Sequence, residues 1–189
     1  SWLIELKKPG SEVWATEIGL ALTGMEWPTI QVETHGEYLP RTFLLSQGSA
    51  KAANVCWHDF GLGMFGICDR QGYPRPALLS FAGLVSRLSG ATPVQRHDLG
   101  GGLQGFTFRR KDKDVMALWS ESRVEFARLN PEGMNLSAKL YDFYGNEQTY
   151  LIPQQGLALP VTGRIVYLES PSLRLVDLSR IEPVQITPS

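Results

Sequence analysis

The chain has 189 residues, of which 43% are hydrophobic and 20% are charged, a composition typical of a folded globular protein. Its 18 lysine and arginine residues nearly balance 19 aspartate and glutamate residues, so the net charge is −1. We interpret the short basic run Arg109, Arg110 and Lys111 as a solvated hairpin tip. Because nucleic-acid-binding proteins neutralise phosphates with a basic patch, we expect no nucleic-acid partner.

The two cysteines, Cys56 and Cys68, are too few for a disulfide scaffold and lack the spacing of metal ligands. They permit one disulfide bond and do not require it. No apolar run approaches the roughly 18 to 20 residues that span a bilayer, so we expect no membrane span. The opening residues SWLIELKKPG carry no signal-peptide pattern, and the compartment stays open at this point.

The first ninety residues mix helix and strand signals. In chain order, the patterns predict a helix end within 2–8, a strand over 12–19, a long loop over 22–40, a helix over 41–54, a strand over 55–61, a glycine-rich loop over 61–74 and a helix over 75–90. Alternation of helices with short apolar strands predicts parallel strands joined by right-handed crossovers.

The composition shifts near residues 88–94, and the rest of the chain is typical of hairpins. Short segments with alternating apolar residues predict strands over 103–110, 114–121, 123–129, 136–143, 147–153, 157–161 and 164–170. The alternation gives each strand one buried face, as in an antiparallel β-sandwich. The aromatic residues of these strands are accordingly expected in the sandwich core.

Two strands of the first part end in chemically active side chains. Strict alternation places Glu17 on the same face as Ala15, at the carboxyl end of its strand. The second strand places Trp57 and Asp59 on one face and His58 on the other, where we expect a hydrogen-bonded core residue beneath the helices. If the two strands are adjacent and parallel, Glu17, Trp57 and Asp59 converge at one rim.

Ligands bind at that rim in barrels and open parallel sheets. A carboxylate beside an indole ring is the composition of a sugar site, where the ring stacks on the sugar and the carboxylate attacks or protonates. From the residues alone, a glutamate at a strand end has a second interpretation, in which it forms a salt bridge or anchors a loop.

The segments VWATEIG, VCWHDFG and GICDRQGYPRPALLSFAGLVSRLSG occur in this order, and together they resemble the last quarter of retaining (β/α)8 glycosidases similar to glycoside hydrolase family 39. In that family a W-x-T-E-x-G segment forms strand seven, and its glutamate is the nucleophile. A later segment like ALPVTGRIVYLE belongs to the family's C-terminal β-sandwich. The resemblance covers roughly Trp2 to Glu169, with Arg75 where the family usually has lysine.

The resemblance implies an α/β part followed by an all-β part: the last strands and helices of an incomplete (β/α)8 barrel over 1–90, an antiparallel β-sandwich over 91–170 and a C-terminal extension over 171–189. It implies that Glu17 is the catalytic nucleophile and Trp57 a sugar-stacking platform. Asp59, and His35 and Trp27 in the long loop, are expected as further substrate contacts. No metal or organic cofactor is implied.

Retaining glycosidases use a second carboxyl group, about 5–5.5 Å from the first, as acid/base. In the family this glutamate follows an asparagine at the end of strand four, and no Asn-Glu pair precedes Glu17. We therefore expect a chain that is inactive alone and needs the N-terminal part of the barrel, from the same precursor or as a separate chain, to hydrolyse O-glycosidic bonds of an oligo- or polysaccharide. The expected location is secreted or periplasmic. The alternative is a noncatalytic carbohydrate-binding or structural β-sandwich module.

Overall fold

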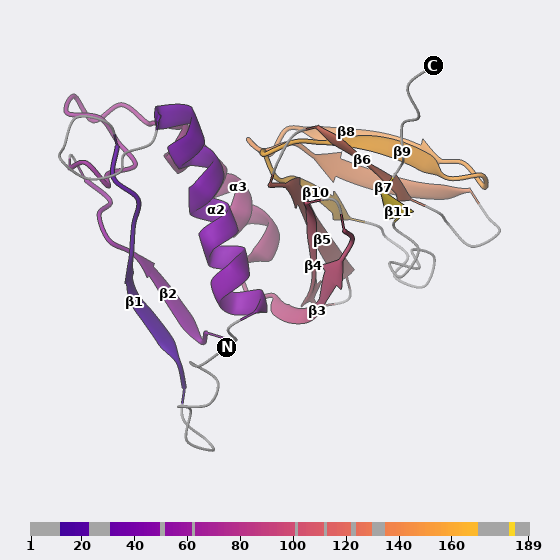
Figure 1. Ribbon diagram of the computed structural model, residues 1–189, viewed down its shortest axis with the longest axis horizontal. Coiled ribbons are helices and arrows are strands. Elements are labelled where there is room, and N and C mark those ends of the chain that lie inside the picture. Colours follow the sequence, from indigo (N-terminus) through magenta and orange to yellow (C-terminus); the bar gives the residue numbers. More distant parts are fainter. Residues whose placement is uncertain are drawn as a thin grey trace. The chain divides into compact units, whose positions relative to one another are not determined.

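The structure is a computed structural model that describes residues 12–22, 31–49, 52–61, 63–100, 102–111, 113–121, 124–129, 135–169 and 182–183 (Figure 1). The chain divides into two compact units, residues 1–85 and 86–189. The helix end expected within residues 2–8 lies outside the described residues, as does most of the C-terminal extension. Each unit is described by itself below.

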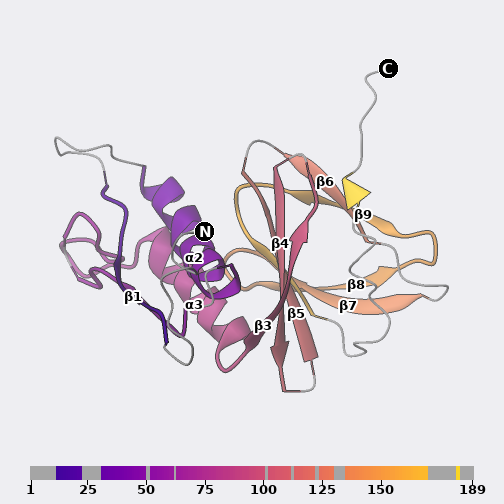
Figure 2. The ribbon, with the colours of Figure 1, turned by 60° about the horizontal axis from the view of Figure 1, so that its bottom comes forward.

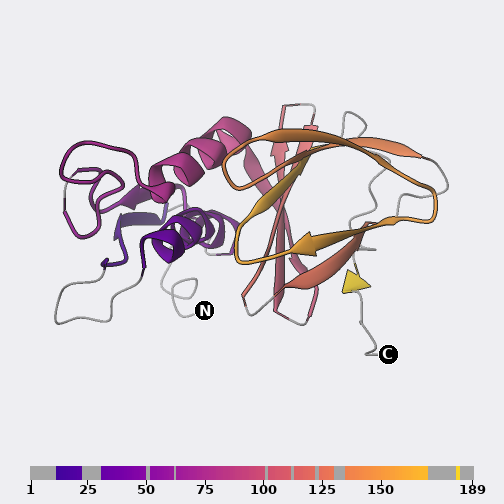
Figure 3. The same ribbon diagram turned by 90° about the horizontal axis from the view of Figure 1, so that it is seen from above.

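The described residues of the first unit form two strands and two helices in alternation. They are β1 (Trp14–Ile18), α2 (Val32–Gly48), β2 (Asn54–Trp57) and α3 (Pro76–Leu88), the last of which runs into the second unit. β1 and β2 pair in parallel, with Trp14 opposite Asn54 and Ala15 opposite Val55. The two helices lie next to one another on the same side of the strands (Figures 1 and 3). The predicted parallel strand pair is confirmed.

The helices cover the face of β2 that carries Val55 and Trp57, both half-buried. Leu39 and Phe43 of α2 and Phe81 of α3 lie against this face, around a cavity of about 280 Å³. The rings of Phe43 and Phe81 are 5.3 Å apart. Apolar packing therefore holds both helices on one face of the strand pair.

The other face of the strand pair is exposed. Asn54 and Cys56 alternate with the half-buried residues of β2 and are exposed, and Trp14 of β1 is 57% exposed. Among the described residues of this unit, no helix packs on that face. A (β/α)8 barrel has eight strands, and the described residues supply two, so a closed barrel is not formed by this part alone.

Helix α2 corrects the sequence prediction, because it begins at Val32 within the expected loop and continues through Pro40. Proline lacks the N–H group that would donate to the carbonyl of Gly36 one turn earlier. The buried Ser80 hydroxyl of α3 donates to this carbonyl instead, at 2.9 Å. A side chain at Gly36 would meet Pro76 at 3.0 Å, so glycine permits the close approach of the helices. A tertiary contact thus offsets the cost of an internal proline.

In the second unit, the residues that the structure describes form two antiparallel sheets (Figure 2). Its strands are β3 (Thr92–Asp98), β4 (Leu103–Arg110), β5 (Lys113–Ser120), β6 (Glu125–Leu129), β7 (Leu136–Tyr141), β8 (Glu147–Ile152), β9 (Leu157–Val161), β10 (Val166–Glu169) and β11 (Glu182–Pro183). The first sheet has the order β3-β4-β5-β10-β7-β8, and the second has the order β11-β6-β9.

One apolar core joins the two sheets. It draws on the six-stranded sheet and on the three-stranded sheet, through Leu103, Met116, Leu118, Ala138, Ile152 and Leu168 of the first and Ala127, Leu129, Leu159 and Val161 of the second. The strands predicted between residues 103 and 170 coincide with β4 to β10. This arrangement is a β-sandwich, as expected. The aromatic residues Phe106, Phe108 and Trp119 are buried, but their expected place in the sandwich core is wrong. They share a face with Val115 and Ala117, whereas the core residues Met116 and Leu118 lie on the opposite face of the same sheet.

Strand β3 was not predicted, since its sequence has few strand signals. It begins with Thr92 and Pro93 and is mostly exposed, with only His97 buried among the residues whose burial is described. It pairs with β4 alone, at the edge of its sheet, and its register shifts between Pro93 and Gln95. Proline and polar residues are typical of edge strands, and they hide the alternation that marks inner strands.

Candidate active site

A β-bulge near the end of β1 decides where Glu17 lies. Ala15 is opposite Val55 and Ile18 is opposite Trp57, so β1 uses three residue steps where β2 uses two. The extra residue reverses the alternation beyond it, and Thr16 and Glu17 are both exposed. Glu17 therefore lies on the face that the helices leave uncovered.

The expectation that Glu17 and Trp57 share a face is consequently wrong. Ile18 occupies the position opposite Trp57, and the preceding Glu17 lies on the other face. His58, which alternates with Trp57, lies on that face too. It was expected in the core beneath the helices, and this expectation is also wrong because its side chain is 41% exposed.

Glu17 and His58 form an ion pair. His58 Nδ1 is next to Glu17 Oε1, and the Glu17 side chain is 66% exposed. The backbone N–H of His58 also donates to the carbonyl of Ile18 at 2.8 Å, which fixes the end of β2 beside the end of β1. The pair is thus placed at the carboxyl ends of two adjacent parallel strands, where α/β proteins bind ligands.

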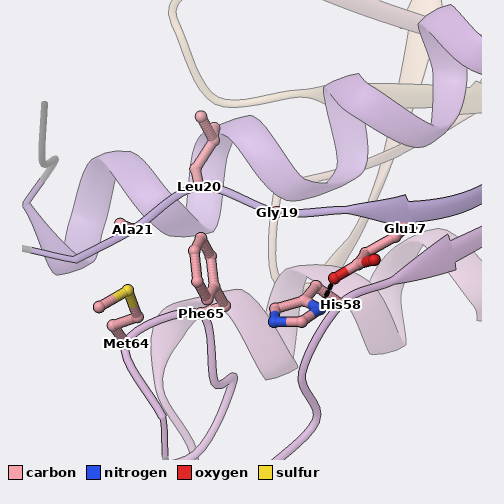
Figure 4. A pocket seen from close by; sticks show the side chains of 7 residues that line it. All are labelled: Glu17, Gly19, Leu20, Ala21, His58, Met64 and Phe65. Carbon is pink, nitrogen blue, oxygen red and sulfur yellow. Dashed lines mark ion pairs between the residues drawn. The ribbon is translucent and has the colours of Figure 1, made fainter. Parts of the chain in front are cut away.

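A cavity of about 640 Å³ opens beside this pair. Figure 4 shows Glu17 and His58 at one end of its wall and Met64 and Phe65 further along. The seven lining residues are Glu17, Gly19, Leu20, Ala21, His58, Met64 and Phe65. A carboxylate and an imidazole in a largely apolar wall are the ingredients of a small-molecule site.

Gly19 allows the cavity wall to close around Phe65. A Cβ atom on Gly19 would lie 2.9 Å from Phe65 Cδ1 and 3.2 Å from His58 Cβ. The His58 and Phe65 rings meet edge to face, with centroids 4.9 Å apart. The glycine that follows the strand is therefore needed for the close approach of an aromatic ring to the Glu17–His58 pair.

Trp57 lies on the helix side of β2. Its ring centroid is 5.4 Å from that of His35 in α2, and its indole N–H donates to the carbonyl of Phe65 at 2.8 Å. This geometry separates Trp57 from Glu17 and connects it to the loop that follows β2.

Asp59 stabilises the start of the same loop. Its carboxylate accepts hydrogen bonds from the backbone N–H groups of Gly61 at 2.7 Å and Gly63 at 3.1 Å. Arg75 stabilises the loop from its far end by donating to the carbonyls of Gly63 at 3.2 Å and Gly66 at 2.6 Å. Both side chains make loop contacts and do not line the cavity beside Glu17.

His35 is buried within α2, and neither ring nitrogen has a hydrogen-bond partner among the described residues. Burial lowers the pKa of His35 to about 4, and the positive charge of Arg75 adds to this effect. The imidazole is therefore neutral at physiological pH. Trp27, the remaining predicted contact, lies outside the described residues.

Sequence reasoning missed His58 and Phe65 as parts of the site. The bulge that brings His58 to Glu17 has no signal in the sequence. Phe65 had a weak signal, since it is an aromatic residue between Met64 and Gly66 in a glycine-rich loop after the second strand. Loops at this rim commonly carry ligand contacts.

Other kinds of site find no support in the described part of the chain. The residues that the structure describes contain no group of three or more histidine, cysteine, aspartate or glutamate side chains that could hold a metal ion. Neither of the described helices has the length and apolar character needed to cross a membrane. Cys56 and Cys68 are both free cysteines.

Comparison of the sequence with protein-family models and with curated proteins gives no match. Solved structures do match. A family 39 glycoside hydrolase from the gut symbiont Bacteroides cellulosilyticus WH2 aligns with 84% of this chain and 34% of its own, at a TM-score of 0.70 and 24% identity. A family 30 endoxylanase from Clostridium papyrosolvens C71 aligns with 86% of this chain and 42% of its own, at a TM-score of 0.64 and 10% identity.

A third structure, a conserved exported protein from Bacteroides fragilis, aligns with 85% of this chain and 39% of its own, at a TM-score of 0.57 and 14% identity. The chain thus spans between 34% and 42% of the length of these three structures. It has the fold of the C-terminal part of glycoside hydrolases of families 39 and 30. The resemblance noted in the sequence is confirmed as a likeness of fold.

Proposed function

We propose that this chain is the C-terminal part of a retaining glycoside hydrolase and that Glu17 is its nucleophile. The observation that carries the proposal is the position of Glu17 at the carboxyl end of β1, on the face opposite the helices. In a (β/α)8 barrel the helices cover the outside and the active site lies at the carboxyl ends of the strands. Glu17 occupies the position of an inward-facing residue at that end.

In the proposed reaction the Glu17 carboxylate attacks the anomeric carbon of the sugar, and the bond to the leaving oxygen breaks as a glycosyl-enzyme ester forms. A second carboxylic acid, supplied by polypeptide outside this chain, gives its proton to the leaving oxygen. The same group then removes a proton from water, which attacks the anomeric carbon and releases Glu17.

The partner of Glu17 fits this role. With a proton on Nδ1, His58 donates to the Glu17 carboxylate and fixes one of its oxygens, and the other oxygen is left to attack. Orientation of a nucleophile by a positioned donor contributes to catalysis because it favours the reactive geometry.

The remaining strands of the barrel are proposed to come from polypeptide outside the 189 residues, in the same precursor or as a separate chain. Within the described residues each of β1 and β2 pairs only with the other, so each has one unpaired edge. The structural neighbours are more than twice as long as their aligned parts. The barrel strands would cover the face that carries Trp14, Cys56 and Glu17.

We propose an oligo- or polysaccharide as substrate and a secreted or periplasmic location. One structural neighbour is described as an endoxylanase and another as an exported protein. Substrates of this size are commonly degraded outside the cytoplasm, which agrees with both descriptions.

The alternative of a noncatalytic carbohydrate-binding module receives no specific support. Among the described residues of the sandwich, Phe106, Phe108, Trp119 and Tyr141 are buried. Tyr144 is 40% exposed, but its ring packs edge to face on that of Phe143 in a turn and offers no extended platform. Titration of the chain with xylotriose tests it, since an independent module binds the sugar without the rest of the barrel.

The test of the proposal is Glu17→Gln in the complete protein. This variant keeps the shape of the side chain and removes the charge that attacks. We expect hydrolysis of 4-nitrophenyl glycosides to be lost while the circular dichroism spectrum stays unchanged. A second variant, Glu17→Ala, leaves room for an external anion, and restoration of its cleavage by added azide with formation of a glycosyl azide of inverted configuration identifies the role of Glu17. Turnover that survives the substitution would end the assignment.

A further inference from the structure

The apolar part of the cavity wall lies directly beside the Glu17–His58 pair. Phe65, Met64 and Leu20 line the cavity together with the pair (Figure 4). Sugar rings present C–H groups on their faces, and these groups pack favourably on aromatic rings. Phe65 is the aromatic residue among the cavity's lining residues, and its ring meets the ring of His58 edge to face.

Trp57 cannot take this role in the observed geometry. Its ring lies on the helix side of β2 near His35, on the face opposite Glu17. Its indole N–H is already bound to the carbonyl of Phe65. A sugar held against Glu17 would therefore meet Phe65 and not the indole ring.

The loop that carries Phe65 is held at several points. Trp57 binds the carbonyl of Phe65, and the carbonyl of the adjacent Met64 accepts a hydrogen bond from the N–H of Leu22 at 2.9 Å. Asp59 and Arg75 bind backbone groups on either side, as described above. A ring fixed before the ligand arrives loses little conformational entropy on binding.

We propose that Phe65 is the residue on which the sugar beside the reacting bond stacks and that Trp57 is a positioning residue that holds Phe65 in place. This inference rests on the proposed function, because it takes a sugar as the ligand of the Glu17 cavity. In this proposal the loop after β2 supplies the sugar contact, and the hydrogen bond from the Trp57 indole to the carbonyl of Phe65 holds that contact in place.

The first experiment measures kcat and KM of the complete protein on 4-nitrophenyl β-xyloside, β-glucoside and β-galactoside. Phe65→Leu keeps an apolar side chain of similar volume and removes the ring, and Phe65→Tyr keeps the ring. We expect the leucine variant to raise KM about tenfold, the difference expected for loss of an aromatic contact, and the tyrosine variant to stay within about twofold of the original protein. Tyr73→Ala is the matched control, since Tyr73 is an exposed aromatic residue of the same loop that does not line the cavity.

The second experiment separates positioning from general stability. Trp57→Phe keeps a ring near His35 and removes the N–H that binds the carbonyl of Phe65. If Trp57 acts through Phe65, the double variant Trp57→Phe with Phe65→Leu has the same KM as Phe65→Leu alone. Additive increases in KM would show independent roles and would overturn the positioning part of the proposal.

The outcomes distinguish this inference from the proposed function. The proposed function is contradicted if the original protein hydrolyses none of the three glycosides and no xylan. It is also contradicted if hydrolysis survives in Glu17→Gln. Turnover that depends on Glu17 while Phe65→Leu leaves KM unchanged contradicts the role of Phe65 alone. An equal rise in KM for the leucine and tyrosine variants would also contradict it, because the ring would then be irrelevant.

Discussion

Glu17 and His58 form an ion pair across the parallel strands β1 and β2, on the face that the helices do not cover. The pair exists because β1 carries one extra residue between Ala15 and Ile18. Without the bulge, alternation would turn Glu17 toward the helices, where an unpaired carboxylate is costly to bury. The backbone irregularity therefore sets both the partner and the direction of the proposed nucleophile.

The first prediction concerns His58. Removal of its side chain in His58→Ala leaves the Glu17 carboxylate without its positioned donor, so we expect kcat of the complete protein to fall about 10- to 100-fold while KM changes little. His58→Gln retains a donor group near the carboxylate and is expected to recover part of the loss. Steady-state kinetics on the 4-nitrophenyl glycoside that the original protein cleaves fastest measure both effects. Equal kcat for the original protein and the alanine variant would show that the ion pair has no catalytic role.

The second prediction concerns the uncovered face of the strand pair. Cys56 lies on this face and is exposed among the described residues, whereas Cys68 is half-buried in the loop after β2. If further barrel strands pack on the face, native complete protein should react with iodoacetamide at Cys56 far more slowly than unfolded protein does. Peptide mass spectrometry after timed labelling measures the two rates.

Cys68 serves as the internal reference for this labelling, because it is half-buried within its own loop, where it forms a backbone bridge with Pro74. Fast reaction of Cys56 in the native complete protein, as fast as after unfolding in urea, would contradict a covering barrel.

The sequence predicted the elements that depend on local pattern. The two short strands, helix α3 and the inner strands of the sandwich all show clear apolar periodicity, and they occur where it placed them. The start of α2 could not be predicted, because Pro40 is a helix-breaking signal and the compensating hydroxyl of Ser80 comes from another helix. The edge strand β3 was missed because exposed strands need no alternation.

The residues of the candidate site also divide into those that the sequence predicted and those that it could not predict. Glu17 was predicted as a site residue from the family-like motif of its strand, and in the structure it lines a cavity at the end of that strand. Its neighbours could not be derived, since a single inserted residue exchanges the two faces of a strand and nothing in VWATEIG announces it. Trp57 and Asp59 were correctly placed near the end of β2, yet their observed contacts are with the following loop.

The third prediction tests the helix pair of the first unit. Ser80→Ala removes the hydroxyl that donates to the carbonyl of Gly36 and leaves a buried acceptor without its partner. We expect a decrease in the free energy of unfolding of about 1–3 kcal/mol. Urea denaturation followed by circular dichroism measures the change.

Thr42→Ala is the matched control for this substitution. Thr42 also donates its hydroxyl to a carbonyl within α2, that of Tyr38 at 2.8 Å, but the contact is exposed and water can replace it. A loss for Ser80→Ala no larger than that for Thr42→Ala would show that the carbonyl of Gly36 does not need Ser80.

The last prediction follows from the burial of His35, whose pKa is lowered from 6.5 to about 4 in the folded protein. The unfolded chain binds a proton near pH 6.5 and the folded chain does not, so the unfolded state gains protons as the pH falls between these values. The stabilising effect of a neutral His35 is fully present above pH 6.5 and is lost as the pH falls toward 4. We expect this histidine to lower the free energy of unfolding by on the order of 2 kcal/mol between pH 7 and pH 4.

His35→Phe keeps an aromatic ring next to Trp57 and removes the titrating group. The free energy of unfolding of this variant and of the original protein is measured in urea at intervals from pH 7 to pH 4. The difference between the two proteins gives the contribution of His35 alone, because His97, whose pKa is also lowered by burial, is present in both. The variant should gain stability relative to the original protein as the medium becomes more acidic. A difference that stays constant over this range would mean that His35 takes up a proton in the folded protein as readily as in the unfolded chain, and that the ring nitrogens have a partner that accepts the charge.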